Sequence, residues 1–254
     1  MNYMKKLLSI LISLFLVGCS EETSKISKNI SWGIGKDKDD NHQPLDCVKA
    51  NETYASYDAI FVGPVEKKIY LTFDNGYENG NTEEILDILL KYQIHAVFFI
   101  TGYYAANEDA IVRRMINEGH TIGNHSFSHK SFQNQSREGI KNDIMKLHRL
   151  MIEKYNYVMD VLRPPLGEFS IDSLQVSKDL NYQNVFWSFA YYDYNVKKQP
   201  SETDALDKLE KGLHPGAIYL LHSISDTNKK VLEEFINYVY NEGYKICDYD
   251  LNQS

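Results

Sequence analysis

Two histidines, His125 and His129, stand four residues apart in the run Asn-His-Ser-Phe-Ser-His. Imidazoles at this spacing can bind one divalent cation when they share a tight loop or a helical turn. The chain has 8 histidines, so such a pair also arises by chance, as two capping or solvent-facing side chains. By itself, the spacing is a weak indication of a metal site.

A carboxylate and a guanidinium stand at two further places where an apolar run ends. Asp74 follows the run 69–73 and precedes Asn75 and Gly76, so it can point into a cleft or cap backbone N–H groups at a turn. Arg163 begins Arg-Pro-Pro-Leu-Gly. A guanidinium here can hold a carboxylate ionised and oriented, and a surface arginine on a rigid turn is the alternative.

An acid and a third histidine follow two later apolar runs. Asp193 comes after Trp-Ser-Phe-Ala-Tyr-Tyr, where it can orient a histidine, and His222 directly follows 217–221. A histidine in that position is, taken alone, most simply a satisfied core residue. Taken together, six such side chains at successive strand ends indicate one site, because their convergence on one rim by accident is improbable.

The elements that must position these residues alternate regularly from Lys67 onward. We expect strands at 69–73, 96–100, 121–125, 161–162, 184–190, 217–221 and 244–247, and helices at 81–93, 109–118, 137–155, 171–180, 203–213 and 228–241. Short apolar strands alternating with helices predict an α/β fold with a parallel sheet, either open and doubly wound or closed into a barrel. Both architectures place their sites at the C-terminal ends of the strands.

Length and charge narrow the class of protein. The 254 residues suffice for one sizeable core and are few for two full domains. Lys plus Arg number 27 against 35 Asp plus Glu, which gives a net charge of −8. A nucleic-acid-binding protein usually carries a basic excess, so we expect no nucleic-acid partner.

The first residues resemble a lipoprotein signal peptide over 1–18. Lys5 and Lys6 precede a short apolar run that ends in Leu-Val-Gly-Cys, a sequence similar to a bacterial lipobox with Cys19 as the lipidated residue. A plain signal peptide or a buried amphipathic helix is the alternative. Residues 19–65 are polar and are expected to form an irregular tether and N-terminal extension. We therefore expect a protein anchored by lipid to the outer face of the bacterial cytoplasmic membrane.

The two remaining cysteines, Cys47 and Cys247, form a disulfide or stay as two buried thiols, and their spacing does not decide between these outcomes. The sequence contains no CxxC pair, so we expect no cysteine ligand to a metal.

Five motifs, TFDNGY, NHSFSH, RPPLG, FWSFAYYDY and LLH, together resemble those of the polysaccharide deacetylases, which are the NodB-homology enzymes of carbohydrate esterase family 4. The resemblance implies one deacetylase domain over 66–254 with a distorted (β/α) barrel of about seven parallel strands. The runs IYLTFDNGYENG, GHTIGNHSFSH and GAIYLLHS are similar to the branch that de-N-acetylates peptidoglycan N-acetylmuramic acid and leads to muramic delta-lactam in the spore cortex.

The resemblance also assigns roles to individual residues. It implies Asp74 as general base, His222 as general acid, Arg163 and Asp193 as their respective positioning partners, and the backbone N–H of Leu166 as an oxyanion donor. It implies one divalent cation, zinc or another ion, bound by His125, His129 and Asn75. Most members carry Asp where Asn75 stands, and this neutral amide leaves the identity of the metal open.

The function expected from these residues is metal-dependent removal of the N-acetyl group from N-acetylmuramic acid in a peptide-free glycan strand, by a monomeric enzyme. The alternatives are a deacetylase of N-acetylglucosamine in peptidoglycan or chitin-like glycans, a catalytically silent glycan-binding lipoprotein, and a solute-binding lipoprotein. The last would need two lobes, and no duplicated pattern is visible in the sequence.

Overall fold

The computed structural model describes residues 29–249. The predicted signal peptide 1–18 and Cys19 lie outside the described residues. Within 29–249, the structure contains no helix whose length and apolar character would let it cross a bilayer.

A parallel sheet of nine strands forms the centre of the described chain. Its strands are β2 (Ala59–Ile60), β3 (Lys68–Asn75), β4 (Val97–Ile100), β5 (Thr121–Asn124), β6 (Val161–Leu162), β8 (Gln183–Val185), β9 (Phe189–Ala190), β10 (Ala217–His222) and β11 (Lys245–Ile246). Their order is β2-β8-β6-β5-β4-β3-β10-β9, with β11 beside the start of β3. Every pairing in this sheet is parallel, which confirms the prediction from the apolar runs.

The segment Gln183–Ala190 curls the sheet toward a closed barrel. Its first part, β8, pairs with β6, and its last part, β9, pairs with β10. Between them, Ser188 N–H donates to Ile218 O at 3.0 Å. The single strand expected at 184–190 was therefore wrong, because the chain changes partners partway along. The predicted distorted (β/α) barrel is confirmed.

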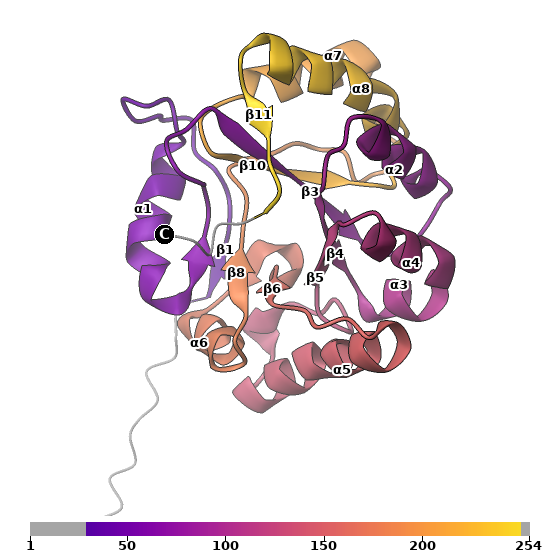
Figure 1. Ribbon diagram of the computed structural model, residues 1–254. Helices are drawn as coiled ribbons and strands as arrows, with labels where there is room; N and C mark the ends of the chain where they lie inside the picture. Colours follow the sequence, from indigo (N-terminus) through magenta and orange to yellow (C-terminus); the bar gives the residue numbers. More distant parts are fainter. Residues whose placement is uncertain (1–28, 250–254) are drawn as a thin grey trace, which may run out of the picture.

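Helices surround the sheet (Figure 1). They are α1 (Leu45–Tyr54), α2 (Thr82–Lys91), α3 (Gly102–Asn107), α4 (Asp109–Asn117), α5 (Arg137–Tyr155), α6 (Ile171–Asp179), α7 (Glu202–Lys211) and α8 (Asp226–Asn241). Serine side chains at the N-caps of α5, α6, α7 and α8 accept backbone N–H groups of the first turn. Short 3₁₀ turns lie at η1 (Ala55–Tyr57), η2 (Phe132–Asn134) and η3 (Pro165–Gly167).

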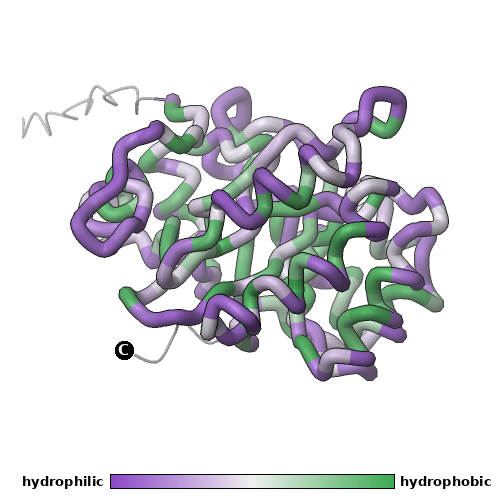
Figure 2. Tube along the Cα trace, turned by 90° about the horizontal axis from the view of Figure 1, so that it is seen from above, coloured by the Kyte–Doolittle hydropathy of each residue, from purple (hydrophilic) through white to green (hydrophobic). Residues whose placement is uncertain are grey.

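Alternation along the strands sorts apolar side chains into two cores. On β3, Leu71 and Phe73 join the larger cluster packed against the helices, whereas Tyr70 joins the second cluster inside the curled sheet. The apolar positions run through the interior, and polar positions lie mainly outside (Figure 2). Because successive side chains point to opposite faces, Asp74 shares the inner face with Tyr70.

The segment before β3 differs from the irregular tether that the sequence predicted. Residues 29–65 contain α1, β2 and a short strand β1 (Ile30–Ser31), which pairs antiparallel with β7 (Glu168–Phe169). Phe61 is fully buried in the inner cluster. This part of the chain is therefore an integral layer of the domain.

Both described cysteines are free thiols. Cys47 is buried in the inner cluster, where burial raises its pKa to about 12. Cys247 is partly buried at the edge of the same cluster. The structure thus contains the two separate thiols and not the disulfide.

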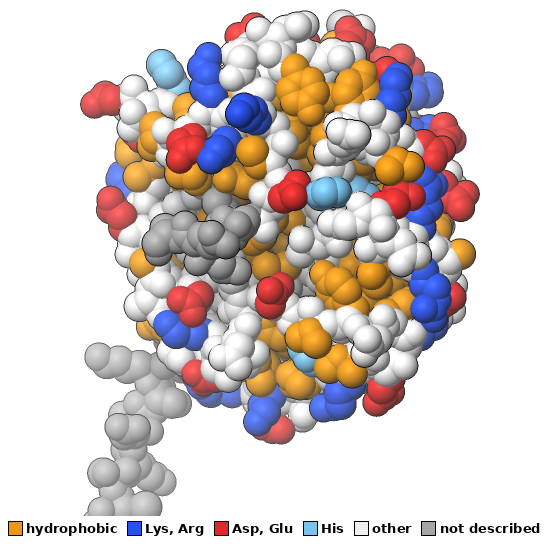
Figure 3. All heavy atoms as spheres, in the orientation of Figure 1, with side chains coloured by type: hydrophobic (Ala, Val, Ile, Leu, Met, Phe, Trp, Pro, Cys, Tyr) orange, Lys and Arg blue, Asp and Glu red, His pale blue; other side chains and the backbone are white. Residues whose placement is uncertain are grey.

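On the face shown in Figure 3, acidic and basic side chains are interspersed with apolar ones. No broad field of a single charge sign covers this view of the described residues.

Candidate active site

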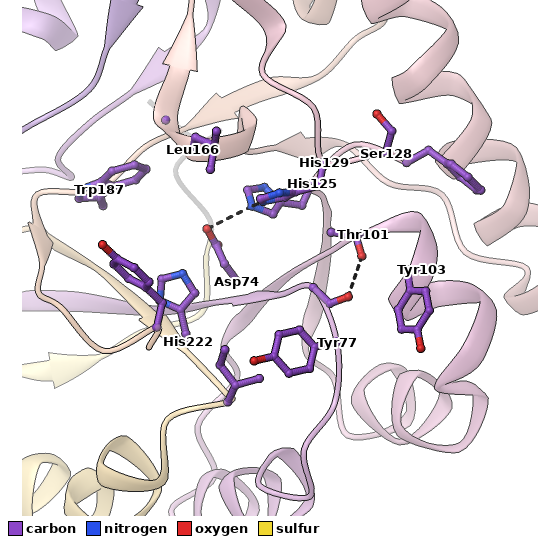
Figure 4. Close-up of a pocket in the computed structure, with 15 residues that line it drawn as sticks. Asp74, Tyr77, Thr101, Tyr103, His125, Ser128, His129, Leu166, Trp187 and His222 are labelled. Atoms are coloured by element: carbon purple, nitrogen blue, oxygen red, sulfur yellow. Dashed lines mark hydrogen bonds and ion pairs between the residues drawn. The ribbon is translucent and has the colours of Figure 1, made fainter. Parts of the chain in front are cut away.

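A cleft of about 670 Å³ opens at the C-terminal ends of the strands. Asp74 from β3, His125 and His129 from the loop after β5, and His222 from the end of β10 face it together (Figure 4). The other lining residues are Gly76, Tyr77, Thr101, Tyr103, Phe127, Ser128, Leu166, Gly167, Trp187, Tyr194 and Ile224. The structure therefore brings together residues that are up to 150 positions apart, from Asp74 to Ile224.

Arg163 holds the carboxyl of Asp74 from below the cleft. Its Nη1 lies 2.7 Å from Asp74 Oδ1, and its side chain is 0% exposed. Burial opposes the ionisation of Asp74, but the positive charges and hydrogen bond of its neighbours outweigh it and keep the pKa of this carboxyl below its usual value. Asp74 is thus a carboxylate at neutral pH.

Each nitrogen of the Arg163 guanidinium has a partner within the protein. Nε donates to Val185 O and Nη2 donates to Phe186 O, each at 3.1 Å. The plane also lies over the ring of Phe99, 4.2 Å from its centroid. These contacts fix the orientation of Arg163, with its Nη1 directed at Asp74.

The loop that carries His125 and His129 is held in a conformation that few residues adopt. Ser126 and His129 have φ of 62° and 55°, in the left-handed region. Asn124 Oδ1 accepts from Ser126 N–H at 2.9 Å, and Ser126 Oγ accepts from His129 N–H at 2.9 Å. The side chain of Asn124 thereby turns the chain sharply, so that two imidazoles four residues apart meet.

The two imidazoles converge with their Nε2 atoms 3.2 Å apart. His125 Nδ1 lies 2.9 Å from Arg163 O, so it carries the proton and leaves the lone pair on Nε2. Burial lowers the pKa of His125 to about 4 and also lowers that of His129. Both rings are therefore neutral at neutral pH, which is the protonation state of a metal ligand.

This donor pair fits a divalent cation. Two imidazole ligands at about 2.0–2.1 Å from one ion can lie 3.2 Å from each other. Among residues 29–249, however, no three His, Cys, Asp or Glu side chains are arranged to hold one ion. His125 and His129 are therefore the two side chains that would hold such an ion.

Asn75, the predicted third ligand, contacts a different residue. Its Oδ1 accepts from Ser223 Oγ at 3.1 Å, and its Nδ2 is buried without a partner. Asn75 follows Asp74 on β3 and is not one of the residues that line the cleft. Its part in metal binding stays a prediction.

His222 is positioned by Asp193, which is 1% exposed. Its Nδ1 lies 2.7 Å from Asp193 Oδ1, and its backbone N–H donates to Oδ2 at 2.8 Å. Asn228 Nδ2 donates to the same Oδ2 at 2.6 Å and fixes the carboxylate. Burial lowers the pKa of His222, but the hydrogen bond and charge of Asp193 outweigh it and raise the pKa above its usual value.

Leu166 lies across the cleft from Tyr77 (Figure 4), and Gly167, the next residue, also lines the cleft. Both have left-handed backbones, with φ of 61° and 64°. A Cβ on Gly167 would lie 2.4 Å from Trp187, so only glycine permits this close approach. The Leu166 side chain is 61% exposed on the rim.

Several lining residues were given no role by the sequence analysis. Thr101 follows β4 and donates to Gly76 O at 3.2 Å, and Tyr77, Tyr103, Trp187 and Tyr194 add aromatic surface. Thr101 had a visible signal, because it directly follows the apolar run 96–100, a strand end that carried no assigned residue. Tyr77, Trp187 and Tyr194 lie within the quoted motifs TFDNGY and FWSFAYYDY, where no role was assigned to them. Tyr103 had no signal, since the chain has 19 tyrosines.

The arrangement can activate water beside an electrophile and protonate a leaving group. It contains a carboxylate, an imidazole with a raised pKa, two neutral imidazoles and an exposed aromatic rim. A polysaccharide deacetylase family model matches residues 62–185. Together with the relatives described next, this match shows that the chain belongs to the polysaccharide deacetylase family, carbohydrate esterase family 4.

Among its relatives is the peptidoglycan-N-acetylmuramic acid deacetylase PdaA of Bacillus subtilis, 38% identical over 92% of this chain and 89% of that protein. The solved structure of B. subtilis PdaA aligns with a TM-score of 0.82 and 37% identity, and covers 87% of this chain and 95% of that one. A family 4 carbohydrate esterase from Bacillus anthracis aligns with a TM-score of 0.73 and 32% identity, over 89% and 97% of the two chains.

Proposed function

We propose that this protein hydrolyses the acetamide of N-acetylmuramic acid residues in peptidoglycan. The observation that carries the proposal is the placement of Asp74 and His222 on adjacent strands, each with its own buried partner, on one cleft beside the imidazole pair. The 38% identity to PdaA over most of both chains supports muramic acid as the sugar.

Asp74 is the base in this proposal. Its carboxylate is aimed by Arg163 and lies beside the imidazole pair, with Oδ2 3.4 Å from His125 Nε2. A water between these groups and the acetamide carbon gives its proton to Asp74 as its oxygen forms the new C–O bond. A divalent cation held by His125 and His129 would polarise the carbonyl and acidify that water.

His222 is the acid. The hydrogen bond with Asp193 fixes Nδ1–H, so Nε2 is the nitrogen that faces the cleft and transfers a proton. When the C–N bond breaks, His222 protonates the departing nitrogen, and acetate and the free amine of the sugar are released. Water and the amide are consumed in equal amounts.

The negative charge that develops on the carbonyl oxygen needs a donor in the same cleft. The left-handed turn at Leu166 places that residue on the wall of the cleft. We assign its backbone N–H to the oxyanion.

The proposed product explains a further step. Removal of the acetyl group from muramic acid leaves an amine near the lactyl carboxylate of the same sugar, and the closure of a lactam is then intramolecular and entropically favoured. A role in forming the muramic delta-lactam of spore cortex is part of the proposal.

Product analysis tests the sugar and the reaction together. Peptide-free muramic oligosaccharides and chitin oligomers are incubated with the protein and a series of divalent metals, and the masses of the products are measured by mass spectrometry. We expect the loss of one acetyl group per muramic residue and little change in chitin. Preferential deacetylation of chitin would point to N-acetylglucosamine instead, and glycan binding without acetate release under every metal would overturn the enzymatic proposal.

For localisation, we propose lipidation at Cys19 and anchoring to the outer face of the cytoplasmic membrane. Eleven residue steps separate Cys19 from Ile30, so the chain can extend at most about 40 Å between lipid and domain. The variant Cys19→Ser should move the protein from the membrane fraction to the soluble fraction. An unchanged distribution would mean that another segment is the anchor.

A further inference from the structure

The first described residues contact the active-site wall and not the opposite end of the barrel. Ile30 and Ser31 pair with Phe169 and Glu168 of β7, directly after the Leu166–Gly167 turn. The next residue, Trp32, donates its backbone N–H to Gly167 O at 2.9 Å. Three consecutive residues thus bond to the loop that carries the assigned oxyanion donor.

The indole of Trp32 joins this loop to a second cleft segment. Its Nε1 donates to Trp187 O at 3.0 Å, and its ring lies 4.4 Å from the Phe61 ring centroid. Gly167 and Trp187 both line the cleft and approach so closely that a Cβ on Gly167 would overlap the Trp187 ring. Trp32 therefore donates hydrogen bonds to both residues of this close contact, Gly167 and Trp187.

A side-chain bond also ties the segment to η2 (Phe132–Asn134), which packs beside β7. Gln133 Nε2 donates to Ile30 O at 2.8 Å. Gln133 belongs to η2, which follows the loop of His125 and His129. The segment Ile30–Trp32 consequently bridges the oxyanion wall and the chain that leaves the metal-binding loop.

Two adjacent left-handed residues, one of them a leucine, persist only where the surroundings fix them. Hydrogen bonds from the segment Ile30–Trp32 provide that constraint on the carbonyl of Gly167 and on β7. We propose that Ile30–Trp32 is an N-terminal clasp that positions the Leu166–Gly167 wall for catalysis, with Trp32 as its main positioning residue. The inference rests on the proposed deacetylase function.

The variant Trp32→Phe tests the clasp. It keeps an aromatic ring against Phe61 and removes the N–H bonded to Trp187 O. Asn51→Ala is the matched control, because Asn51 bonds to Phe61 N–H and Val62 O in the same N-terminal region, and neither of these residues lines the cleft. Full-length wild type and both variants are compared for melting temperature, kcat, KM and hydrogen exchange of peptides covering 164–169.

For Trp32→Phe we expect kcat to fall about threefold to tenfold with KM within about twofold, and exchange in 164–169 to accelerate by a similar factor. Asn51→Ala should lower the melting temperature while kcat and exchange in 164–169 stay near wild type. Gln133→Ala, which removes the bond to Ile30 O, should also lower kcat and gives an independent test if Trp32→Phe does not fold.

Unchanged kcat in Trp32→Phe would overturn the clasp, whether or not exchange accelerates, because a purely structural contact predicts that result. A loss of kcat in Asn51→Ala equal to that in Trp32→Phe would also overturn it. If wild type releases no acetate from any glycan, the proposed function fails, whereas the exchange comparison still shows whether Ile30–Trp32 holds the loop.

Discussion

Asp74 and His222 are opposite each other in the parallel register of β3 and β10, and both face the cleft. The charges of the two groups favour each other: His222 lowers the pKa of Asp74, and Asp74 raises the pKa of His222. Arg163 also lowers the pKa of Asp74, and Asp193 also raises the pKa of His222. At neutral pH the pair is therefore a carboxylate beside a readily protonated imidazole, as a base and an acid in one reaction require.

The first prediction concerns Asp193→Asn and pH. The raised pKa of His222 keeps its acid form present above the ordinary histidine pKa, and that form is lost as pH rises through the raised value. Without the Asp193 charge the pKa of His222 falls, so the alkaline limb of the kcat profile should move to lower pH, and kcat at neutral pH should drop about 10²-fold. Asp207→Asn, at an exposed carboxylate paired with Lys211, is the control. An alkaline limb at the same pH in Asp193→Asn would exclude His222 as the proton donor.

The second prediction concerns Asp74→Asn, which should reduce turnover roughly 10²–10⁴-fold, measured as acetate release. The same change leaves the buried guanidinium of Arg163 without its anion, so the free energy of unfolding should fall by about 3–5 kcal/mol. Denaturant unfolding therefore has to accompany the assay.

The double variant Asp74→Asn with Arg163→Met distinguishes these two effects. Removing the unpaired charge should recover part of the stability, although Val185 O and Phe186 O lose their donor. Turnover should stay as low as in Asp74→Asn. Acetate release at the wild-type rate in either variant would exclude Asp74 as the base.

The strand ends and their chemistry could be predicted from the sequence because both depend on local patterns. An apolar strand that ends in Asp74 or His222 fixes, by alternation, which side of the sheet the polar residue faces. The parallel sheet then gathers these ends on one rim. The resemblance contributed the roles, and the structure places Arg163 and Asp193 directly behind the residues that they were expected to orient.

The N-terminal layer could not be predicted in this way. Its strands β1 and β2 are two residues long, too short for any periodicity, and its helix α1 has only two buried residues, Cys47 and Ala50. Trp32 gave no local signal, since its partners Gly167 and Trp187 are more than a hundred residues away. Long-range contacts of this kind are set by the assembled barrel.

The third prediction concerns metal binding. His125→Ala should weaken binding of Zn²⁺ at least tenfold by calorimetry, because one of two converging imidazoles is lost. His95→Ala is the matched control: His95 is paired with Asp248 and does not line the cleft. Equal affinities in the two variants would remove His125 from the ligand set. Asn75→Ala measured alongside decides whether its carboxamide leaves Ser223 to become a ligand, since unchanged affinity would exclude it.

The last prediction concerns Gly167→Ala. The added Cβ meets Trp187 at 2.4 Å, and alanine is disfavoured at φ of 64°. We expect the free energy of unfolding to fall by about 1–3 kcal/mol, and kcat to fall because the wall at Leu166 shifts. Gly33→Ala is the control, as a Cβ there meets no atom within 4 Å. Adding Trp187→Phe to Gly167→Ala should relieve the overlap and recover part of the stability, while the backbone strain remains. If Gly167→Ala matched Gly33→Ala in both stability and kcat, the close contact between Gly167 and Trp187 would not be what shapes this wall of the cleft.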